Sequence, residues 1–166
     1  MKQHLLFVCL GNICRSPAAE GIMRSLVESR GLSDDFLIDS AGIGSWHVGQ
    51  LPDIRMRRCG QQYGYTFDSR ARQLQPEDFD RFDFIIVMDD ENLSDARRVA
   101  RTEKGRSKLR SMAHYLRSHP GQLTIPDPYY GSERDFHLVI ELLEDACESL
   151  LDSLIIDAGR PTRSSF

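Results

Sequence analysis

The chain has 166 residues, of which 40% are apolar and 28% are charged, a balance that predicts one compact domain with a hydrophobic core and excludes a disordered chain. Its formal net charge of −4 argues against a nucleic-acid partner bound through phosphate-backbone electrostatics, and the basic stretches at 55–58 and 97–110 are interpreted as solvated helix faces. No apolar run approaches the ~18 residues needed to cross a bilayer, so no membrane insertion is expected.

Short apolar runs with the length and composition of strands alternate with segments of helical period. These strand-like runs are 5–10, 36–43, 82–89 and 108–112. Alternation of this kind predicts an α/β domain with a mostly parallel sheet.

The first helix is expected to begin near Ser16 and Pro17, where a capping hydroxyl precedes a proline whose missing N–H costs nothing at a helix start. Its predicted apolar stripe consists of Ile22, Met23, Leu26 and Val27.

The last helix has the strongest pattern, because apolar residues recur at three- and four-residue steps. The predicted stripe is Phe136, Val139, Ile140, Leu143, Ala146, Cys147, Leu150, Leu151 and Leu154. Cys147 therefore reads as a small core residue, and Cys59 is interpreted in the same way.

An irregular loop is predicted ahead of that helix, because residues 118–132 contain three prolines and two glycines. Loops of this length inside a compact domain tend to be functional. We expect one domain over residues 1–158, and we predict that the polar residues 159–166 form a disordered tail.

The segment LLFVCLGNICRS (5–16) combines a strand end, a tight turn and the start of a helix. Backbone N–H groups and a helix dipole at such a turn form an anion site. Gly11 permits the tight turn and Asn12 tolerates a left-handed backbone. Arg15 offers a planar fork for two phosphate oxygens, and Cys9 lies under the same positive field as a candidate thiolate nucleophile.

Other interpretations of the segment fit less well. GNICRS lacks the spacing of a nucleotide-binding loop, and GIGSWH (42–47) lacks the third glycine of the dinucleotide fingerprint. A zinc site from Cys9, Cys14, His114 and His119 has tolerable spacing within each pair, but the pairs lie far apart along the chain.

A thiol that attacks phosphorus needs a proton donor for the leaving oxygen. Asp127, held between two prolines in PDPYY (126–130), is one candidate. The alternative is an ordinary turn aspartate, which is the usual role of Asp before Pro.

At this point the residues resemble a known family. VCLGNICRSPAAE (8–20) with DPYY (127–130) is similar to the low-molecular-weight protein tyrosine phosphatases, and SAG (40–42), WHVG (46–49), ARQ (71–73) and FDFIIVMDDENL (82–93) match in the same order. The resemblance implies a single α/β domain, a four-stranded parallel sheet with helices on both faces and a phosphate-binding loop after the first strand. It implies no cofactor and no metal.

The resemblance also assigns roles, with a tyrosine-phosphorylated protein as the expected partner. Cys9 is the expected nucleophile that forms a phosphocysteine, Arg15 the clamp on the phosphoryl group, and Asp127 the acid and then the base. Ser16 is expected to hydrogen-bond the Cys9 thiolate and Asn12 to prop the loop open. The expected phosphate- and substrate-binding residues are Leu10, Gly11, Asn12, Ile13, Cys14, Ser16, Trp46, Tyr129 and Tyr130.

Trp46 and Tyr129 are expected to wall a deep cleft, which favours phosphotyrosine over the shorter phosphoserine. The alternative for Trp46 is a core tryptophan. Family members usually carry histidine where this chain has Ser69. The loop asparagine is therefore expected to lack the support of that histidine, with a water bridging the gap to the shorter hydroxyl.

Cys14 carries a further expectation from the resemblance, a reversible disulfide with Cys9 on oxidation, against the alternative of a packed thiol. Two other functions stay open. One is a thiol-dependent arsenate reductase, which needs a further close cysteine pair, and the other is a phosphotyrosine-binding module without chemistry. Four cysteines and a short apolar start unlike a secretory leader predict a cytoplasmic protein with reduced thiols.

Overall fold

The sheet has four parallel strands in the order β2-β1-β3-β4. The computed structural model describes residues 2–159. The strands are β1 (Gln3–Cys9), β2 (Phe36–Gly42), β3 (Phe84–Val87) and β4 (Leu109–Ser111). Each lies within or beside a predicted run, so the predicted α/β class and parallel sheet are confirmed.

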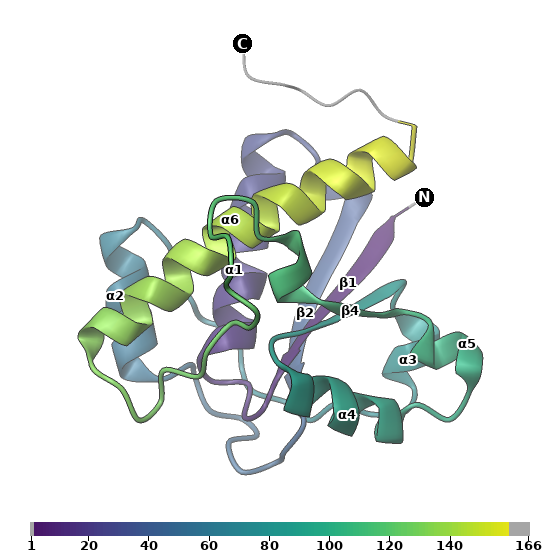
Figure 1. Ribbon diagram of the computed structural model, residues 1–166, viewed down its shortest axis with the longest axis horizontal. Coiled ribbons are helices and arrows are strands. Elements are labelled where there is room, and N and C mark those ends of the chain that lie inside the picture. Colours follow the sequence, from purple (N-terminus) through teal and green to yellow (C-terminus); the bar gives the residue numbers. More distant parts are fainter. Residues whose placement is uncertain (1, 160–166) are drawn as a thin grey trace.

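Helices cover both faces of this sheet (Figure 1). They are α1 (Arg15–Ser29), α2 (Ile54–Gln62), α3 (Asp78–Arg81), α4 (Asp90–Val99), α5 (Glu103–Arg106) and α6 (Glu133–Asp157), with short 3-10 turns at Ser33–Asp35 and Met112–Tyr115. The buried side chains of α1, α2 and α6 join one apolar cluster, and those of α3 and α4 join the other.

The central strand β1 explains why the two clusters are separate. Leu5 and Phe7 point into the cluster under α1 and α6, whereas Leu6 and Val8 point into the cluster under α3 and α4. A parallel strand buried on both faces reads as a continuous apolar run, as this one does.

The last helix follows its predicted stripe. Every predicted stripe residue of α6 is buried, and Cys147 and Cys59 lie in the same cluster, so their interpretation as core residues is confirmed. Ser132 and Asp135 form a capping box at the start of α6. α6 ends at Asp157, and the predicted tail lies, except for Gly159, outside the described residues.

The first helix, α1, begins near the predicted position, but the predicted capping role of Ser16 is wrong. The helix begins at Arg15, its N-cap residue is Cys14, and no side chain caps it. Ser16 therefore lies inside the first turn. Its hydroxyl does not cap the helix, because it contacts Cys9 and Asn12 instead of the helix backbone. Pro17 remains in that first turn, where its missing N–H is tolerated.

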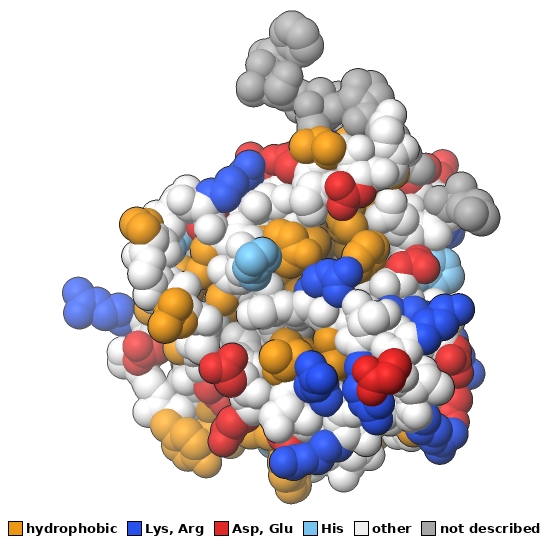
Figure 2. All heavy atoms as spheres, turned by 45° about the vertical axis from the view of Figure 1, so that its right-hand side comes forward, with side chains coloured by type: hydrophobic (Ala, Val, Ile, Leu, Met, Phe, Trp, Pro, Cys, Tyr) orange, Lys and Arg blue, Asp and Glu red, His pale blue; other side chains and the backbone are white. Residues whose placement is uncertain are grey.

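Basic and acidic side chains are interspersed on the face shown in Figure 2. Arg97, Arg98, Arg101 and Lys104 are exposed, and Arg98 pairs with Asp95. Among residues 2–159, no helix is long and apolar enough to span a membrane.

Candidate active site

The strand order places the site. The chain leaves β1 for β2 on one side and later forms β3 on the other side, and ligands of open α/β sheets bind where the order switches in this way. Cys9 ends β1 and Asp89 follows β3 at the same edge. The segment between β1 and α1, residues 10–14, will be called the phosphate loop.

Backbone bonds fix the shape of the phosphate loop. The carbonyls of Cys9 and Leu10 accept from the N–H groups of Ile43 and Gly44, both at 2.9 Å, and the carbonyl of Ile13 accepts from Asp53 at 2.8 Å. Asn12 has φ 57, the left-handed conformation expected for it. Residues outside the loop thus hold the carbonyls of Leu10 and Ile13, and a left-handed residue in a short turn is a feature of the backbone nests that bind anions.

Gly42 lets β2 approach this loop. A Cβ at Gly42 would lie 2.9 Å from the carbonyl carbon of Gly11 and 3.0 Å from the nitrogen of Asn12, so any larger residue would displace the loop backbone.

Cys9 is buried at the base of the loop, and its Sγ lies 3.0 Å from the Oγ of Ser16. Asn12 Nδ2 donates to the same Oγ at 2.7 Å, and the Ser16 hydroxyl can donate its hydrogen either to Cys9 or to the more distant Ala41 carbonyl at 3.4 Å. A thiolate at Cys9 would thus accept a charge-assisted hydrogen bond.

Arg15 is buried to 2% exposure beside Cys9. Its NH1 donates to Asp89 Oδ2 at 2.6 Å and to the Ile125 carbonyl at 3.0 Å. Burial disfavours the charged guanidinium, but the charges of Cys9 and Asp89 outweigh it and raise the pKa of Arg15 above its ordinary value. The position and the positive charge of Arg15 are therefore fixed before any phosphate binds.

Asp127 lies across the cleft on residues 126–130, which will be called the acid loop. Its Oδ2 is 3.6 Å from Arg15 NH2, and its Oδ1 accepts from the Tyr129 N–H at 3.1 Å. One carboxylate oxygen of Asp127 thus shapes the turn, while the other lies toward Arg15 at the cleft.

A cleft of about 290 Å³ connects these groups. It is lined by Cys9, Leu10, Gly11, Ile13, Cys14, Arg15, Trp46, His47, Asp127, Tyr129 and Tyr130. Two predicted phosphate-binding residues, Asn12 and Ser16, are not on its wall. They are buried behind the loop and support it from there.

The aromatic rim is exposed. Trp46 is 67% exposed and Tyr130 96% exposed, so the alternative of a core tryptophan is wrong. The Trp46 ring lies over Gly44, which has no side chain to block it, and the rings of Tyr129 and Tyr130 meet edge to face at 5.0 Å.

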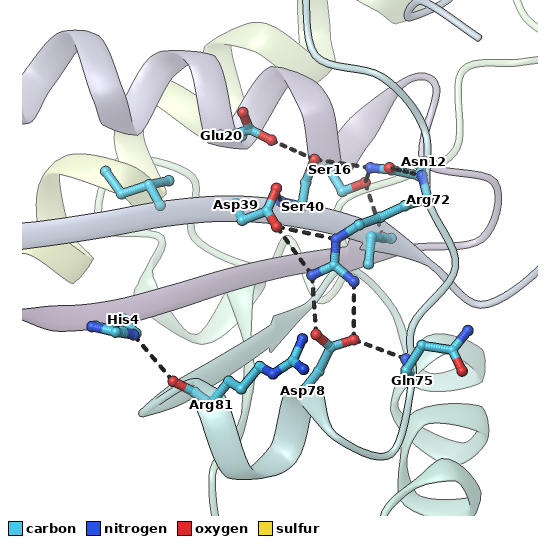
Figure 3. Close-up of polar contacts among 12 residues, drawn as sticks. His4, Asn12, Ser16, Glu20, Asp39, Ser40, Arg72, Gln75, Asp78 and Arg81 are labelled. Carbon is cyan, nitrogen blue, oxygen red and sulfur yellow. Dashed lines mark hydrogen bonds and ion pairs between the residues drawn. The ribbon is translucent and has the colours of Figure 1, made fainter. Parts of the chain in front are cut away.

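A polar network behind the loop supports Asn12 (Figure 3). Asn12 Nδ2 also donates to Ser40 Oγ at 2.9 Å, and Ser40 donates to Glu20 at 2.6 Å. The Arg72 N–H donates to Asn12 Oδ1 at 3.0 Å. Both amide hydrogens of Asn12 are therefore used without Ser69.

Ser69 instead lines a separate hollow of about 220 Å³ together with Glu20 and Arg24. Burial raises the pKa of Glu20 despite the bond from Ser40 and the charge of Arg24. Arg72 in turn is held by Asp39 and Asp78, so a charged cluster anchors the backbone that reaches Asn12.

Cys14 lies at the cleft wall and is 4% exposed. Burial, followed by the negative charges of Asp53 and Cys9, raises the pKa of Cys14 far above its ordinary value. Cys14 is therefore held as a neutral thiol. None of the four cysteines is joined in a disulfide.

Within the described residues, no group of three or more His, Cys, Asp or Glu side chains is arranged to hold a metal ion. The pairs weighed for zinc do not meet, since His119 bonds Asp145 at 2.9 Å while Cys9 and Cys14 face the cleft.

Sequence reasoning missed several residues of this site. Asp89 follows a strand and caps α4, and its place at the carboxyl edge of the sheet was a usable signal. Glu20, Ser40 and Arg72 lie in segments that resemble the family, but those segments do not indicate their roles, because their contacts span 20 to 60 residues.

A buried cysteine and arginine at one anion-sized loop, with a carboxylate facing them, are the parts of a cysteine-dependent phosphatase. The model of the family "Low molecular weight phosphotyrosine protein phosphatase" matches residues 4–158.

Relatives and solved structures agree. A putative low molecular weight protein-tyrosine-phosphatase of Synechocystis is 47% identical over 150 residues, which covers 90% of this chain and 95% of the relative. A protein tyrosine phosphatase from Entamoeba histolytica has a TM-score of 0.89 at 42% identity, covering 95% of this chain and 99% of that one. A Drosophila arginine phosphatase has a TM-score of 0.84 at 34% identity, covering 93% and 98%.

The chain therefore belongs to the low molecular weight phosphotyrosine protein phosphatase family. It is a protein tyrosine phosphatase, which acts on phosphotyrosine in proteins.

Proposed function

We propose that the chain hydrolyses phosphotyrosine in two steps through a phosphocysteine on Cys9. In the first step the Cys9 thiolate attacks phosphorus and the P–O bond to the phenol breaks. Asp127 gives its carboxylic proton to the leaving oxygen. In the second step the Asp127 carboxylate takes a proton from water, and this water attacks the phosphocysteine and releases phosphate.

The observation that carries this proposal is the meeting of three groups on one cleft. Cys9 lies 3.0 Å from Ser16, Arg15 lies beside it, and Asp127 lies 3.6 Å from Arg15. Arg15 and the N–H groups of the phosphate loop would hold the equatorial phosphoryl oxygens, whose charge grows in the loose transition state. The proposed chemistry uses side chains of this chain alone.

Rapid acid quenching during turnover tests the mechanism. Peptide mass mapping should find one phosphoryl group on Cys9, and substituting Asp127 should change how much of it accumulates. A phosphoryl group on another residue, or hydrolysis without any covalent intermediate, would contradict the proposal. Binding of a phosphotyrosine peptide without phosphate release would favour the binding-module alternative.

The walls of the cleft support an aromatic substrate. Leu10 and Ile13 of the phosphate loop line the cleft together with Trp46 and Tyr129, and these apolar and aromatic surfaces fit a phenyl ring. Because one structural neighbour is an arginine phosphatase, matched peptides carrying phosphotyrosine or phosphoarginine should be compared. We expect at least 10-fold higher kcat/KM for phosphotyrosine, and the reverse order would overturn the assignment.

A cytoplasmic location is also part of the proposal. The mechanism needs a reduced Cys9, and the cytosol keeps thiols reduced. A nucleic-acid partner is not expected, because Arg98 and Arg106 pair with acidic neighbours on the basic segment. Cell fractionation and a nucleic-acid binding assay at low salt test these two points.

A further inference from the structure

Arg55 connects the two sides of the cleft without lining it. It lies in the first turn of α2, where Asp53 is the N-cap residue. Its Nε and NH2 donate to the two oxygens of Asp53 at 3.0 and 2.8 Å. The N–H of Asp53 donates to the Ile13 carbonyl of the phosphate loop at 2.8 Å. The guanidinium is therefore anchored, through one residue, to the loop that holds the nucleophile.

The other end of this connection is aromatic. The guanidinium carbon of Arg55 lies 5.3 Å from the ring centre of Tyr129 and 4.7 Å from that of Phe136. Both distances are within the range of a cation–π contact. Phe136 is fully buried in α6, so it provides a rigid wall, whereas Tyr129 belongs to the acid loop.

The acid loop is held more firmly before Asp127 than after it, so a contact that holds Tyr129 matters more. Before Asp127, the buried Ile125 donates to the Met88 carbonyl at 2.9 Å and accepts from Arg15. After Asp127, Tyr129 is 37% exposed and Tyr130 almost entirely exposed. The Tyr129 N–H bonds the Asp127 carboxylate itself, so any movement of Tyr129 is passed directly to the acid.

We propose that Arg55 positions Asp127 for proton transfer by holding the ring of Tyr129. This inference rests on the proposed role of Asp127 as the acid, and it assigns Arg55 a positioning role only. In the step concerned, the Asp127 carboxylic proton moves to the phenol oxygen while the P–O bond breaks and the S–P bond to Cys9 forms. If Tyr129 swings away, the proton donor is displaced while the nucleophile and Arg15 stay in place.

The test measures how the effect of each variant on kcat/KM depends on the leaving group of the substrate. Phenyl phosphate needs acid assistance, whereas 4-nitrophenyl phosphate releases a much weaker base and needs little. For Arg55→Met we expect kcat/KM to fall about 3- to 10-fold for phenyl phosphate, the size of one partly exposed cation–π contact. The fall should be less than about 2-fold for 4-nitrophenyl phosphate, and Arg55→Lys, which keeps the cation, should lie closer to the wild type.

Arg58→Met is the matched control, since Arg58 is an exposed arginine on the same helix. It should leave unchanged the ratio of kcat/KM for phenyl phosphate to kcat/KM for 4-nitrophenyl phosphate. Asp53→Asn is a second variant that keeps a good N-cap residue but loosens the guanidinium, so it should change the ratio in the same direction by less. It also serves if Arg55→Met does not fold.

The pathway through Tyr129 is tested by a double-mutant cycle. In a Tyr129→Leu background, Arg55→Met should cause no further change in the ratio. An equal loss on both substrates, or a full additional effect in this background, would overturn the inference. Asp127→Ala in the same assay separates the two failures. If it changes the ratio and Arg55→Met does not, only the role of Arg55 is wrong, and if neither changes the ratio, the acid itself is misassigned.

Discussion

The phosphate loop and the acid loop face each other across one cleft, yet they are held in opposite ways. Arg15, the residue directly after the phosphate loop, is 2% exposed and bonded to Asp89 and Ile125, whereas the Asp127 side chain is 39% exposed. The first region is preorganised by burial. The second depends on a few contacts at the surface, so small changes there should affect proton transfer before they affect phosphate binding.

The largest loss of activity is expected for a substitution at the buried phosphate loop. Cys9→Ser should abolish hydrolysis, because a hydroxyl is a far weaker nucleophile than a thiolate. Phosphate or vanadate should still bind within a few-fold of the wild-type affinity, since Arg15 and the loop N–H groups remain. Turnover and vanadate titration measure the two quantities separately. Residual turnover near the wild-type rate would remove Cys9 from the nucleophile's role.

Arg15→Lys should come next, with a loss of about 10²- to 10³-fold in kcat, in the range for removing a preorganised group that stabilises transition-state charge. An ammonium cannot reach Asp89 and Ile125 and still present a fork to two phosphoryl oxygens. Because the lysine keeps the charge, thermal unfolding should shift little compared with Arg15→Ala. A Lys variant that retains most of its activity would contradict the role of a phosphoryl clamp.

On the exposed side, Asp127→Ala should lower kcat/KM for phenyl phosphate about 10²- to 10⁴-fold, the usual contribution of a general acid. The loss on 4-nitrophenyl phosphate should be much smaller. Such a difference would show that Asp127 acts as a proton donor and does not merely shape its turn. Equal losses on both substrates would show that the bond from Tyr129 to Asp127, and hence the loop's shape, is what matters.

The same contrast explains what the sequence could predict. The phosphate loop is contiguous, so the spacing of Cys9, Asn12 and Arg15 already indicates its chemistry. Its supports are not contiguous. Asp89 lies 74 residues after Arg15 in the chain, and Arg72 lies 60 residues after Asn12. Both belong to segments that resemble the family, but those segments do not indicate which side chain contacts Arg15 or Asn12.

Ser16 shows the same limit in another way. A hydroxyl before a proline is a good capping signal, but a tertiary contact with Cys9 and Asn12 took precedence over it. Local rules fail at this position because the hydroxyl is needed by the site. Conversely, the stripe of α6 was predicted residue by residue, since burial on one helix face is a local and periodic property.

The smallest effect on basal activity, and the last test of the comparison, concerns Cys14. It lies on the cleft wall with Cys9, and its neutral thiol is stabilised by burial and by the charges of Asp53 and Cys9. Oxidation of Cys9 to a sulfenic acid places an electrophilic sulfur on the same cleft wall, and attack by the Cys14 sulfur would form the S–S bond and release water. We expect peroxide to inactivate the enzyme reversibly through a Cys9 to Cys14 disulfide and bound phosphate to protect it.

Cys14→Ser should keep at least half of the wild-type activity, because the thiol has no part in the proposed reaction, but peroxide should inactivate it irreversibly. Cys59→Ser is the matched control, since Cys59 is buried in the core between α2 and α6, and its inactivation should remain reversible. Peptide mass mapping after mild peroxide measures the crosslink directly. If no 9 to 14 crosslink forms and dithiothreitol restores Cys14→Ser as fully as the wild type, Cys14 is only a packed thiol. Cys9 would then have no neighbouring thiol that protects it from irreversible oxidation.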